Sequence, residues 1–204
     1  MDLSFFLKGM AIGFSIAAPV GPIGVLCIRR TLAEGRTCGF VSGLGAATAD
    51  GLYGIVAGLG LTFLSNLLIQ QQFWVRLIGG LFLCTLGLKT FFAPPAQGDT
   101  PVKGKGLAAA YVSTFVLTLT NPMTILAFAA IFAGLGVGST GGNYGAAGVL
   151  VAGVFTGSAM WWLFLSGAVG LFRRNIGLTG MRWINRISGL IITAFGIVAL
   201  LSLV

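Results

Sequence analysis

Residues 17–24 read AAPVGPIG, and they interrupt an apolar run that would otherwise form one continuous helix. Pro19 and Pro22 each lack a backbone N–H donor, and Gly21 and Gly24 weaken a helix further. What this break means depends on the solvent around it, which the composition of the chain indicates.

Hydrophobic residues make up 56% of the 204 residues and charged residues only 8%. A water-soluble core cannot hide so much apolar surface, so we expect an integral membrane protein. Lipid offers no hydrogen bonds to the backbone groups that a proline frees, so such a break must be buried in protein or line a cavity. The stretch 17–24 therefore indicates a binding site within the membrane.

Apolar runs separated by charged or Gly/Pro-rich segments predict an all-α membrane protein with six spans, each near the ~20 residues that a bilayer requires. The spans are expected at residues 4–28, 39–62, 74–92, 107–133, 144–172 and 184–204. They form a single transmembrane domain over residues 1–204, and no soluble domain is expected.

The positions of Lys and Arg predict the orientation of these spans. Most lie between the first and second span, the third and fourth, and the fifth and sixth. Because such cations are retained on the cytoplasmic side, we expect residues 29–38, 93–106 and 173–183 to face the cytoplasm and both termini to face outward. The net charge of +8 is split among three short loops without a basic stripe, so the expected partner is membrane lipid and not nucleic acid.

Three predicted spans precede the second cytoplasmic loop and three follow it, which predicts two inverted three-helix repeats, at about 1–92 and 107–204. The first span of each repeat is broken near its middle, at residues 19–22 in one and at Asn121-Pro122 in the other. Interrupted spans at corresponding places in inverted halves are the best sequence indication of a transporter site at the midplane.

The second spans of the two repeats also resemble each other. Residues 45–54, GAATADGLYG, align with residues 153–162, GVFTGSAMWW, and the alignment pairs Asp50 with Ser158. It adds Ser158 to the candidate site residues.

Each break carries the signature of a helix start. Asn121 is suited to the N-cap position and Pro122 to the first helical position, and Gly21-Pro22 has the same form with a weaker cap. In the expected orientation both half-helices begin at the bilayer centre, so their positive ends converge there and favour an anion such as a carboxylate. The alternative is two proline kinks whose backbone groups are satisfied by neighbouring helices.

Asp50 is the only acidic residue within a predicted span. A carboxylate in mid-bilayer is costly unless it faces protein or water, so it indicates function. Small residues share its helix face, with Tyr53 one turn along, so we expect the carboxylate to point into the bundle. The alternative is a structural carboxylate that ties two spans together.

Aromatic and small residues add weaker indications. Trp161, near the middle of the fifth predicted span, is a candidate wall residue for a ligand, although lipid contact explains it equally well. Pairs of glycines four residues apart predict close helix contacts, either inside one bundle or in a homodimer. These pairs are Gly9/Gly13, Gly39/Gly43, Gly54/Gly58 and Gly153/Gly157.

Cofactor and catalytic signatures are missing from the sequence. The three cysteines form no CxxC motif and the chain has no His, so we expect no metal site and no cofactor. No pairing of a nucleophile with a general base indicates an enzyme.

The motifs resemble, in order, the LysE/RhtB family of bacterial amino-acid exporters. The likeness covers the whole chain and rests on APVGPIGVLCIRRTLAEGRTCGFVSGLGAATAD (18–50), TLTNPMTILAFAAIFAGLG (118–136) and GSAMWW (157–162). It implies a six-span inner-membrane exporter of amino acids or related small metabolites, driven by the proton gradient. The chain differs from many members in Met123, where they carry a basic residue or His.

We therefore expect a small zwitterion such as an amino acid to bind at the midplane. Its carboxylate is expected at the half-helix ends, residues 21–24 and Asn121–Thr124, and its ammonium or a coupling proton at Asp50. The predicted site consists of Pro19, Gly21, Pro22, Gly24, Asp50, Tyr53, Asn121, Pro122, Thr124, Ser158 and Trp161.

Two alternatives use other chemistry. A membrane thiol relay would place cysteines beside both breaks, but only Cys27 follows Pro22 closely and no Cys lies near Pro122. A metal-ion exporter would need more than one intramembrane acid or thiolate, and Asp50 is the one acid available.

Overall fold

The computed structural model describes residues 3–19, 21–58, 72–94, 105–121, 124–125, 127–128, 144–172 and 176–203. In these ranges the secondary structure is helical, which confirms the predicted all-α class. Seven helices are defined there: α1 (Leu3–Ala17), α2 (Pro22–Glu34), α3 (Arg36–Gly58), α5 (Gln72–Phe91), α6 (Lys105–Leu119), α8 (Tyr144–Phe172) and α9 (Leu178–Leu201).

Several helices have the length and composition of membrane spans. Among the described residues, Gly145–Phe172 and Leu178–Leu201 are long and apolar enough to cross a bilayer, and α1 with α2 forms a third candidate if the bent pair is one span. Gly106–Leu119 is apolar but shorter. Parts of the predicted spans 39–62 and 107–133 lie outside the described residues.

The first predicted span consists of two helices. α1 ends at Ala17, α2 begins at Pro22, and their axes differ by 81°. Pro22 occupies the start of α2 with Gly21 at the N-cap, a place where the missing N–H of proline removes no helical hydrogen bond.

The prediction that residues 29–38 form a loop is wrong. α2 continues to Glu34, and Gly35 alone separates it from α3. Gly35 has a φ of 104°, a backbone conformation that favours glycine. The hydropathy pattern ended the span at the first arginine, whereas the helix continues because Arg30 is buried and hydrogen-bonded within the protein. α9 likewise begins at residue 178 and not at 184.

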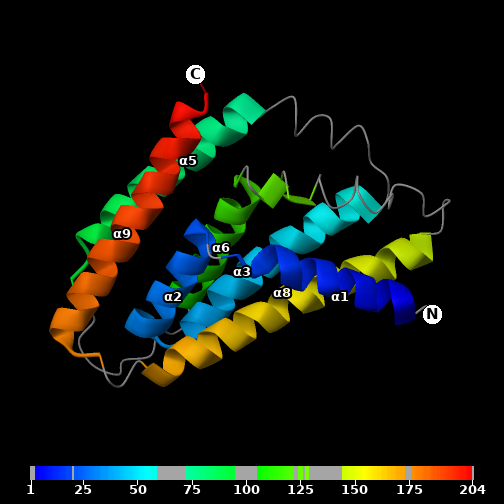
Figure 1. Ribbon diagram of the computed structural model, residues 1–204, viewed down its shortest axis with the longest axis horizontal. Coiled ribbons are helices and arrows are strands. Elements are labelled where there is room, and N and C mark those ends of the chain that lie inside the picture. The colour runs from blue at the N-terminus through cyan, green and yellow to red at the C-terminus, as the bar shows by residue number, and fades with distance from the viewer. Residues whose placement is uncertain are drawn as a thin grey trace.

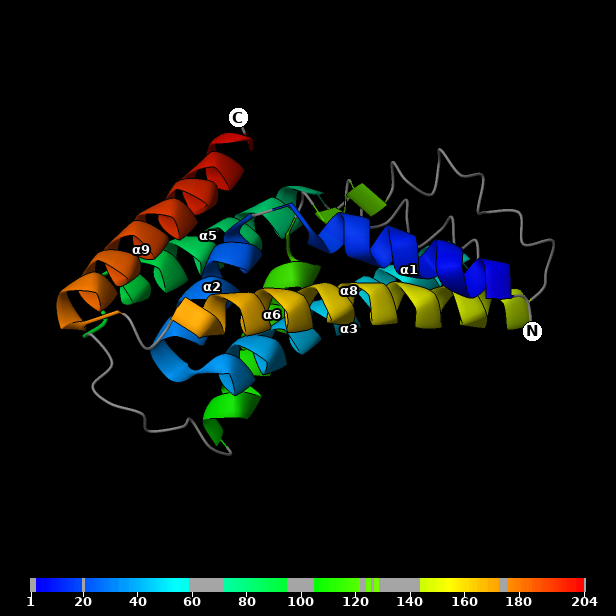
Figure 2. The ribbon, with the colours of Figure 1, turned by 60° about the horizontal axis from the view of Figure 1, so that its bottom comes forward.

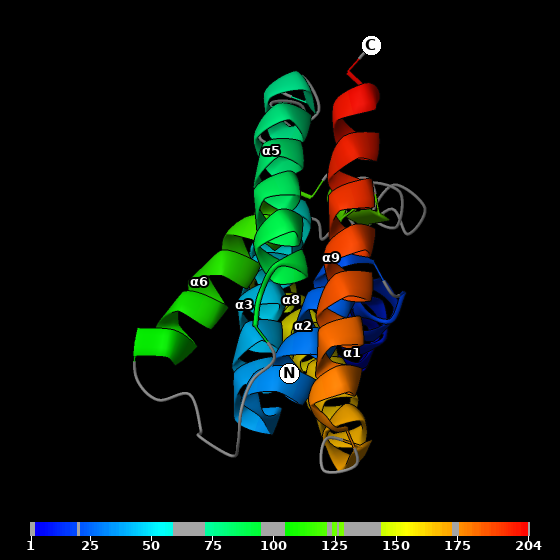
Figure 3. The same cartoon turned by 90° about the vertical axis from the view of Figure 1, so that its left-hand side faces the viewer.

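The helices pack in pairs that link distant parts of the chain. α1 lies along α8, and α3 packs between α8 and α6 (Figures 1 and 2). α5 and α9 form a separate side-by-side pair, seen from the side in Figure 3. α2 contacts α3, α8 and α9 and so lies between the two groups.

Glycines allow the closest of these helix contacts. A Cβ on Gly153 of α8 would collide with the backbone of α1, and one on Gly9 of α1 with the backbone of α8. Gly87 on α5 lies close to the backbone of α9 at Thr193 and Gly189, and Gly80 lies close to the Leu200 side chain and the Gly196 carbonyl. The predicted pairs Gly9/Gly13 and Gly153/Gly157 therefore serve contacts inside one chain.

One hydrophobic cluster surrounds the break between α1 and α2. All seven helices of the described ranges contribute to it. Its buried members are Ala17, Ile23, Leu26, Cys27, Ala46, Ala47, Leu83, Leu117, Trp162 and Ile192. The break thus lies inside the bundle, as its backbone groups require in a membrane.

Candidate substrate site

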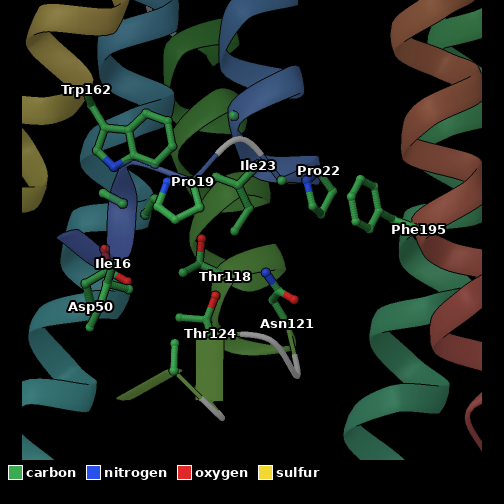
Figure 4. Close-up of a pocket in the computed structure, with 15 residues that line it drawn as sticks. Ile16, Pro19, Pro22, Ile23, Asp50, Thr118, Asn121, Thr124, Trp162 and Phe195 are labelled. Atoms are coloured by element: carbon green, nitrogen blue, oxygen red, sulfur yellow. The ribbon is translucent and has the colours of Figure 1, made fainter. Parts of the chain in front are cut away.

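A cavity of about 320 Å³ adjoins this cluster (Figure 4). Its wall consists of Ile16, Ala17, Pro19, Gly21, Pro22, Ile23, Gly24, Ala46, Asp50, Thr118, Asn121, Thr124, Ala127, Trp162 and Phe195. The volume is at the lower end of the roughly 300–1,000 Å³ of small-molecule sites, so the cavity suits one small metabolite.

The cavity brings together two chain breaks that are distant in sequence. Pro19, Gly21 and Pro22 come from the break between α1 and α2, and Asn121 and Thr124 come from the end of α6 and the helical residues that follow it. Figure 4 shows Pro19, Pro22, Asn121 and Thr124 around the same space.

At the first break, the backbone turns before α2 begins. The Gly21 N–H donates to the Pro19 carbonyl at 3.0 Å, and the Gly21 carbonyl accepts the first helical hydrogen bond, from Val25 N–H, also at 3.0 Å. Gly21 has no side chain to cap the helix, and both Ile23 and Gly24 in the first turn line the cavity. The positive end of α2 therefore adjoins the cavity.

At the second break, a helical turn begins at Asn121. Its carbonyl accepts from the N–H groups of Thr124 at 3.1 Å and Ile125 at 3.2 Å, as the carbonyl of an N-cap residue does. Asn121 is buried and lines the cavity. The predicted site residue Pro122, together with Met123, lies outside the described residues.

Asp50 supplies the charge of the cavity. It lies on α3 and is only 3% exposed, and it is the one charged side chain among the described residues that line the cavity. Ser158 Oγ on α8 donates to Asp50 Oδ2 at 2.7 Å, and Trp162 Nε1 donates to Ser158 Oγ at 3.2 Å. The carboxylate is thus held by one hydroxyl and borders the cavity.

Three predicted site residues lie outside the cavity wall. Ser158 contacts the Asp50 carboxylate but does not itself line the cavity. The Tyr53 hydroxyl donates to the Leu119 carbonyl at 2.7 Å and so satisfies a carbonyl at the end of α6. Trp161 packs edge-to-face against Phe14 at 5.3 Å between ring centroids, while its neighbour Trp162 lines the cavity. Consecutive residues of a helix point about 100° apart, so only one of the two tryptophans can face the site.

Sequence reasoning missed several wall residues. Thr118 had a detectable signal, because a hydroxyl in an apolar span needs a partner, and it bonds its own helix at Thr114. Ile16, Ala127 and Phe195 had none, because an apolar residue in an apolar span looks the same whether it faces lipid or a cavity.

A second polar cluster lies along α2, apart from the cavity. The buried Arg30 guanidinium donates to Ser42 Oγ at 3.0 Å, Ala110 O at 2.9 Å, and Thr114 Oγ1 and Ser113 Oγ at 2.8 Å each. The two cations predicted for a loop, Arg29 and Arg30, therefore join α2 to α9 and α6, since Arg29 Nε donates to Asn185 Oδ1 at 3.0 Å.

The cysteines take no part in the cavity. Cys27 and Cys38 are buried, Cys84 is half-buried, all three are free, and none lines the cavity wall. In the part of the chain that the structure describes, no group of three metal-ligating side chains occurs.

An apolar bundle with interrupted helices around a small cavity defines a membrane transport protein, and comparison with known proteins gives the family. Residues 14–203 match the family described as LysE type translocator, and the chain belongs to this family. It is therefore a transporter and not an enzyme.

Curated relatives cover most of the chain. The protein named "Putative amino acid efflux protein YcgF", from Bacillus subtilis (strain 168), is 28% identical over 95% of this chain and 94% of its own length. "Lysine exporter LysE" of Corynebacterium glutamicum is 24% identical over 96% and 97%, and "Uncharacterized membrane protein YahN" of Escherichia coli (strain K12) is 30% identical over 83% and 77%. No solved structure matches the chain.

Proposed function

We propose that this protein is a secondary active exporter that moves an amino acid, or a similar small zwitterion, out of the cytoplasm across the bacterial inner membrane. The observation that carries the proposal is the cavity itself, where two helix breaks and one buried carboxylate meet. The family and the relatives named for amino acid efflux and lysine export support the same class of cargo.

The two ends of a zwitterion match the two kinds of group in the wall. The substrate's carboxylate binds at the first turn of α2, near Ile23 and Gly24, and beside Asn121 and Thr124. Its ammonium binds Asp50. In this arrangement the substrate's ammonium pairs with the Asp50 carboxylate. The substrate's carboxylate pairs with the positive ends of the two half-helices, so no charge in the cavity is left unpaired.

We further propose six spans arranged as two inverted repeats, residues 1–92 and 107–204, joined by a cytoplasmic loop at 93–106. Helix contacts support this symmetry. Asp50 and Ser158, which the repeat alignment makes equivalent, contact each other at 2.7 Å, as equivalent residues beside a twofold axis do. α1 pairs with α8 as α6 pairs with α3, so the first helix of each half packs on the second helix of the other.

The close glycine contacts repeat with the same geometry. Gly45 and Gly153 are equivalent in the alignment, and each abuts a carbonyl oxygen and the amide nitrogen four residues later on a partner helix. The atoms are Tyr111 O and Phe115 N for Gly45, and Phe6 O and Met10 N for Gly153. The partner helix is the first helix of the opposite half in both cases.

The third helices add a third symmetric contact. Gly80 on α5 abuts Gly196 on α9, and Gly87 abuts Gly189, so the two helices run antiparallel. Gly80 and Gly189 are 109 residues apart, as are Gly87 and Gly196, against 108 for Gly45 and Gly153 in the alignment. Exchanging each glycine for its counterpart in the other half turns one contact into the other. Antiparallel third helices are what two inverted three-helix units require.

Coupling to the proton gradient follows if Asp50 exchanges a proton for the substrate's ammonium. Facing outward, the carboxylate takes a proton and releases the amino acid; facing the cytoplasm, it loses the proton and binds the next one. Each cycle then carries one proton inward for one amino acid outward, with one half of the bundle rocking against the other.

Contacts among the helix ends support the predicted orientation. Arg29 near the end of α2 contacts Asn185 of α9, and Asn185 Nδ2 donates to Ala93 O beyond α5 at 3.1 Å. Arg36 at the start of α3 lies against Gly170 near the end of α8. These contacts bring together described residues within or beside the three predicted cytoplasmic segments. We propose that this end of the bundle faces the cytoplasm, with both termini outward.

Reconstitution tests the proposal. Liposomes with the purified protein are loaded with a mixture of the proteinogenic amino acids, and the amino acids released under an imposed pH gradient are measured by mass spectrometry. We expect at least one to leave faster than from protein-free liposomes, and faster with the gradient than without it. If none does in either orientation of the gradient, the protein is not an amino acid exporter.

A further inference from the structure

We infer that the exported amino acid has an uncharged, mainly apolar side chain, and that Phe195 on α9 contacts that side chain. This inference rests on the proposed function, because it assigns Asp50 to the substrate's ammonium. It comes from the charges available to the cavity and from the position of Phe195 in the wall.

A cationic side chain has no partner in the cavity. The whole chain has four acidic residues, and Asp50 is already assigned to the α-ammonium. Glu34 lies at the far end of α2, roughly 18 Å along the helix from Pro22, and it pairs with Arg29 at 3.2 Å. Asp2 and Asp99 lie outside the described residues, before α1 and between α5 and α6. Among the described residues that line the cavity there is no second acid, so a second ammonium or a guanidinium would be buried against that wall without a counter-ion.

An acidic side chain also has no partner. The chain contains no His, and none of the described residues that line the cavity is Lys or Arg. The nearest cation along α2 is Arg29 or Arg30, about 10–12 Å along the helix beyond Pro22. Both guanidinium groups are bound elsewhere, Arg30 to α3 and α6 and Arg29 to Glu34 and Asn185.

Asp50 and Phe195 lie on opposite sides of the cavity (Figure 4). In Figure 4, Asp50 and Trp162 lie on one side and Pro22 and Phe195 on the other, with Thr118, Thr124 and Asn121 between them. A zwitterion whose ammonium is at Asp50 and whose carboxylate is at the first turn of α2 directs its side chain toward the remaining wall. Ala127 and Phe195 contribute hydrocarbon there.

Phe195 is distinct because it alone brings α9 into the wall. Its side chain lines the cavity directly. A branched or aromatic substrate side chain that packs against this ring buries apolar surface, which favours binding in proportion to the area covered. A polar side chain gains nothing at this position and loses its hydration.

Counterflow measures the selectivity directly. Proteoliposomes with the full chain are loaded with unlabelled leucine, and uptake of labelled leucine is measured against external competitors. We expect valine, methionine and phenylalanine to compete, and lysine, arginine and glutamate not to compete at the same concentration. If lysine or glutamate competes as well as valine, the inference fails while the proposed function stands. If no amino acid exchanges, the proposed function itself fails.

Matched variants test Phe195. Phe195→Ala should raise the KM for leucine about tenfold and leave the KM for alanine nearly unchanged, because only the longer side chain reaches the ring. Phe164→Ala removes the same ring from an exposed position on α8 and serves as the control. Phe195→Leu keeps a large apolar side chain and should retain most of the affinity for leucine. It provides a second test if the alanine variant does not fold. Equal KM values for leucine in Phe195→Ala and Phe164→Ala would remove Phe195 from substrate contact.

Discussion

Ser158 on α8 donates a hydrogen bond of 2.7 Å to the carboxylate of Asp50 on α3. Ser158 in turn accepts a hydrogen bond of 3.2 Å from Trp162, whose ring forms part of the cavity wall. The contact joins the second helices of the two sequence halves, and it fixes the position of the one charged side chain in the cavity wall. Transport that depends on this carboxylate should therefore respond differently to loss of its charge and to loss of its support.

Loss of the charge is produced by Asp50→Asn, which keeps the size and hydrogen bonding of the side chain. We expect the variant to insert and fold but to lose export driven by a pH gradient, because an amide cannot exchange a proton or bind an ammonium. Asp50→Glu should retain part of the activity. Uphill efflux by purified Asp50→Asn in liposomes would exclude a role for Asp50 in coupling, and a variant that cannot be purified intact would favour a purely structural carboxylate.

Loss of the support is produced by Ser158→Ala. One hydrogen bond to the carboxylate disappears, so we expect export to continue at a rate lowered by about tenfold. Thr156→Ala is the matched control, since Thr156 on the same helix bonds only the Ala152 carbonyl of α8, at 2.7 Å. Efflux rates measured side by side should separate the two; identical rates would mean that Ser158 does not position Asp50 for transport.

The breaks should matter more for binding than for folding. Asn121→Ala removes a polar side chain from the cavity at a helix start, and an N-cap loss costs about 0.5–2 kcal/mol of stability. We expect its KM for substrate, and that of Pro22→Ala, to rise by more than this stability change explains. Thr120→Ala is the control, because Thr120 bonds its own helix at Val116. Unchanged KM values in both variants would reduce the breaks to proline kinks.

The anomalous residues of the site were predictable from the sequence. Proline and acid are rare inside membrane spans because both leave polar groups that lipid cannot satisfy, so Pro19, Pro22 and Asp50 are conspicuous without a structure. The structure adds that Asn121 and Pro22 line the same cavity.

The apolar part of the site was not predictable. Whether Trp161 or Trp162 faces the cavity depends on the rotation of α8, which neighbouring helices set and which an all-apolar pattern does not record. Phe195 reaches the cavity from α9, more than seventy residues after Asn121, through packing between helices. The continuation of α2 through Arg29 and Arg30 to Glu34 was missed for a related reason, since hydropathy cannot show that a cation is hydrogen-bonded inside the protein.

Labelling of single cysteines tests the orientation. In a chain whose three native cysteines are replaced, Asp99→Cys should resist an impermeant thiol reagent in intact cells and react after the membrane is opened. Ser139→Cys, between the fourth and fifth predicted spans, should react in intact cells. The reverse pattern, with residue 99 labelled from outside, would invert the topology.

Arg30 offers a test of the fold that is separate from transport. Its guanidinium donates to three hydroxyls, and each hydroxyl also donates to a carbonyl of its own helix: Ser42 to Cys38, Ser113 to Ala109 and Thr114 to Ala110. The hydroxyl hydrogens are therefore used within α3 and α6, and the oxygen lone pairs face the cation. None of these four acceptors is a carboxylate, so hydrogen bonds to hydroxyls and a carbonyl stabilise the buried charge.

Arg30→Gln should lower the free energy of unfolding by about 1–3 kcal/mol. The shorter amide cannot reach all four acceptors, so some buried polar groups between α2, α3 and α6 lose their hydrogen bonds. Arg182→Gln, at an exposed position of α9, should change it by no more than about 0.5 kcal/mol. Thermal unfolding of both variants in detergent gives the comparison. Equal shifts in Tm would mean that the buried hydrogen bonds of Arg30 contribute no more than a surface arginine. A larger loss in Arg30→Gln would show that the cation predicted for a loop instead holds the first half of the chain against the second.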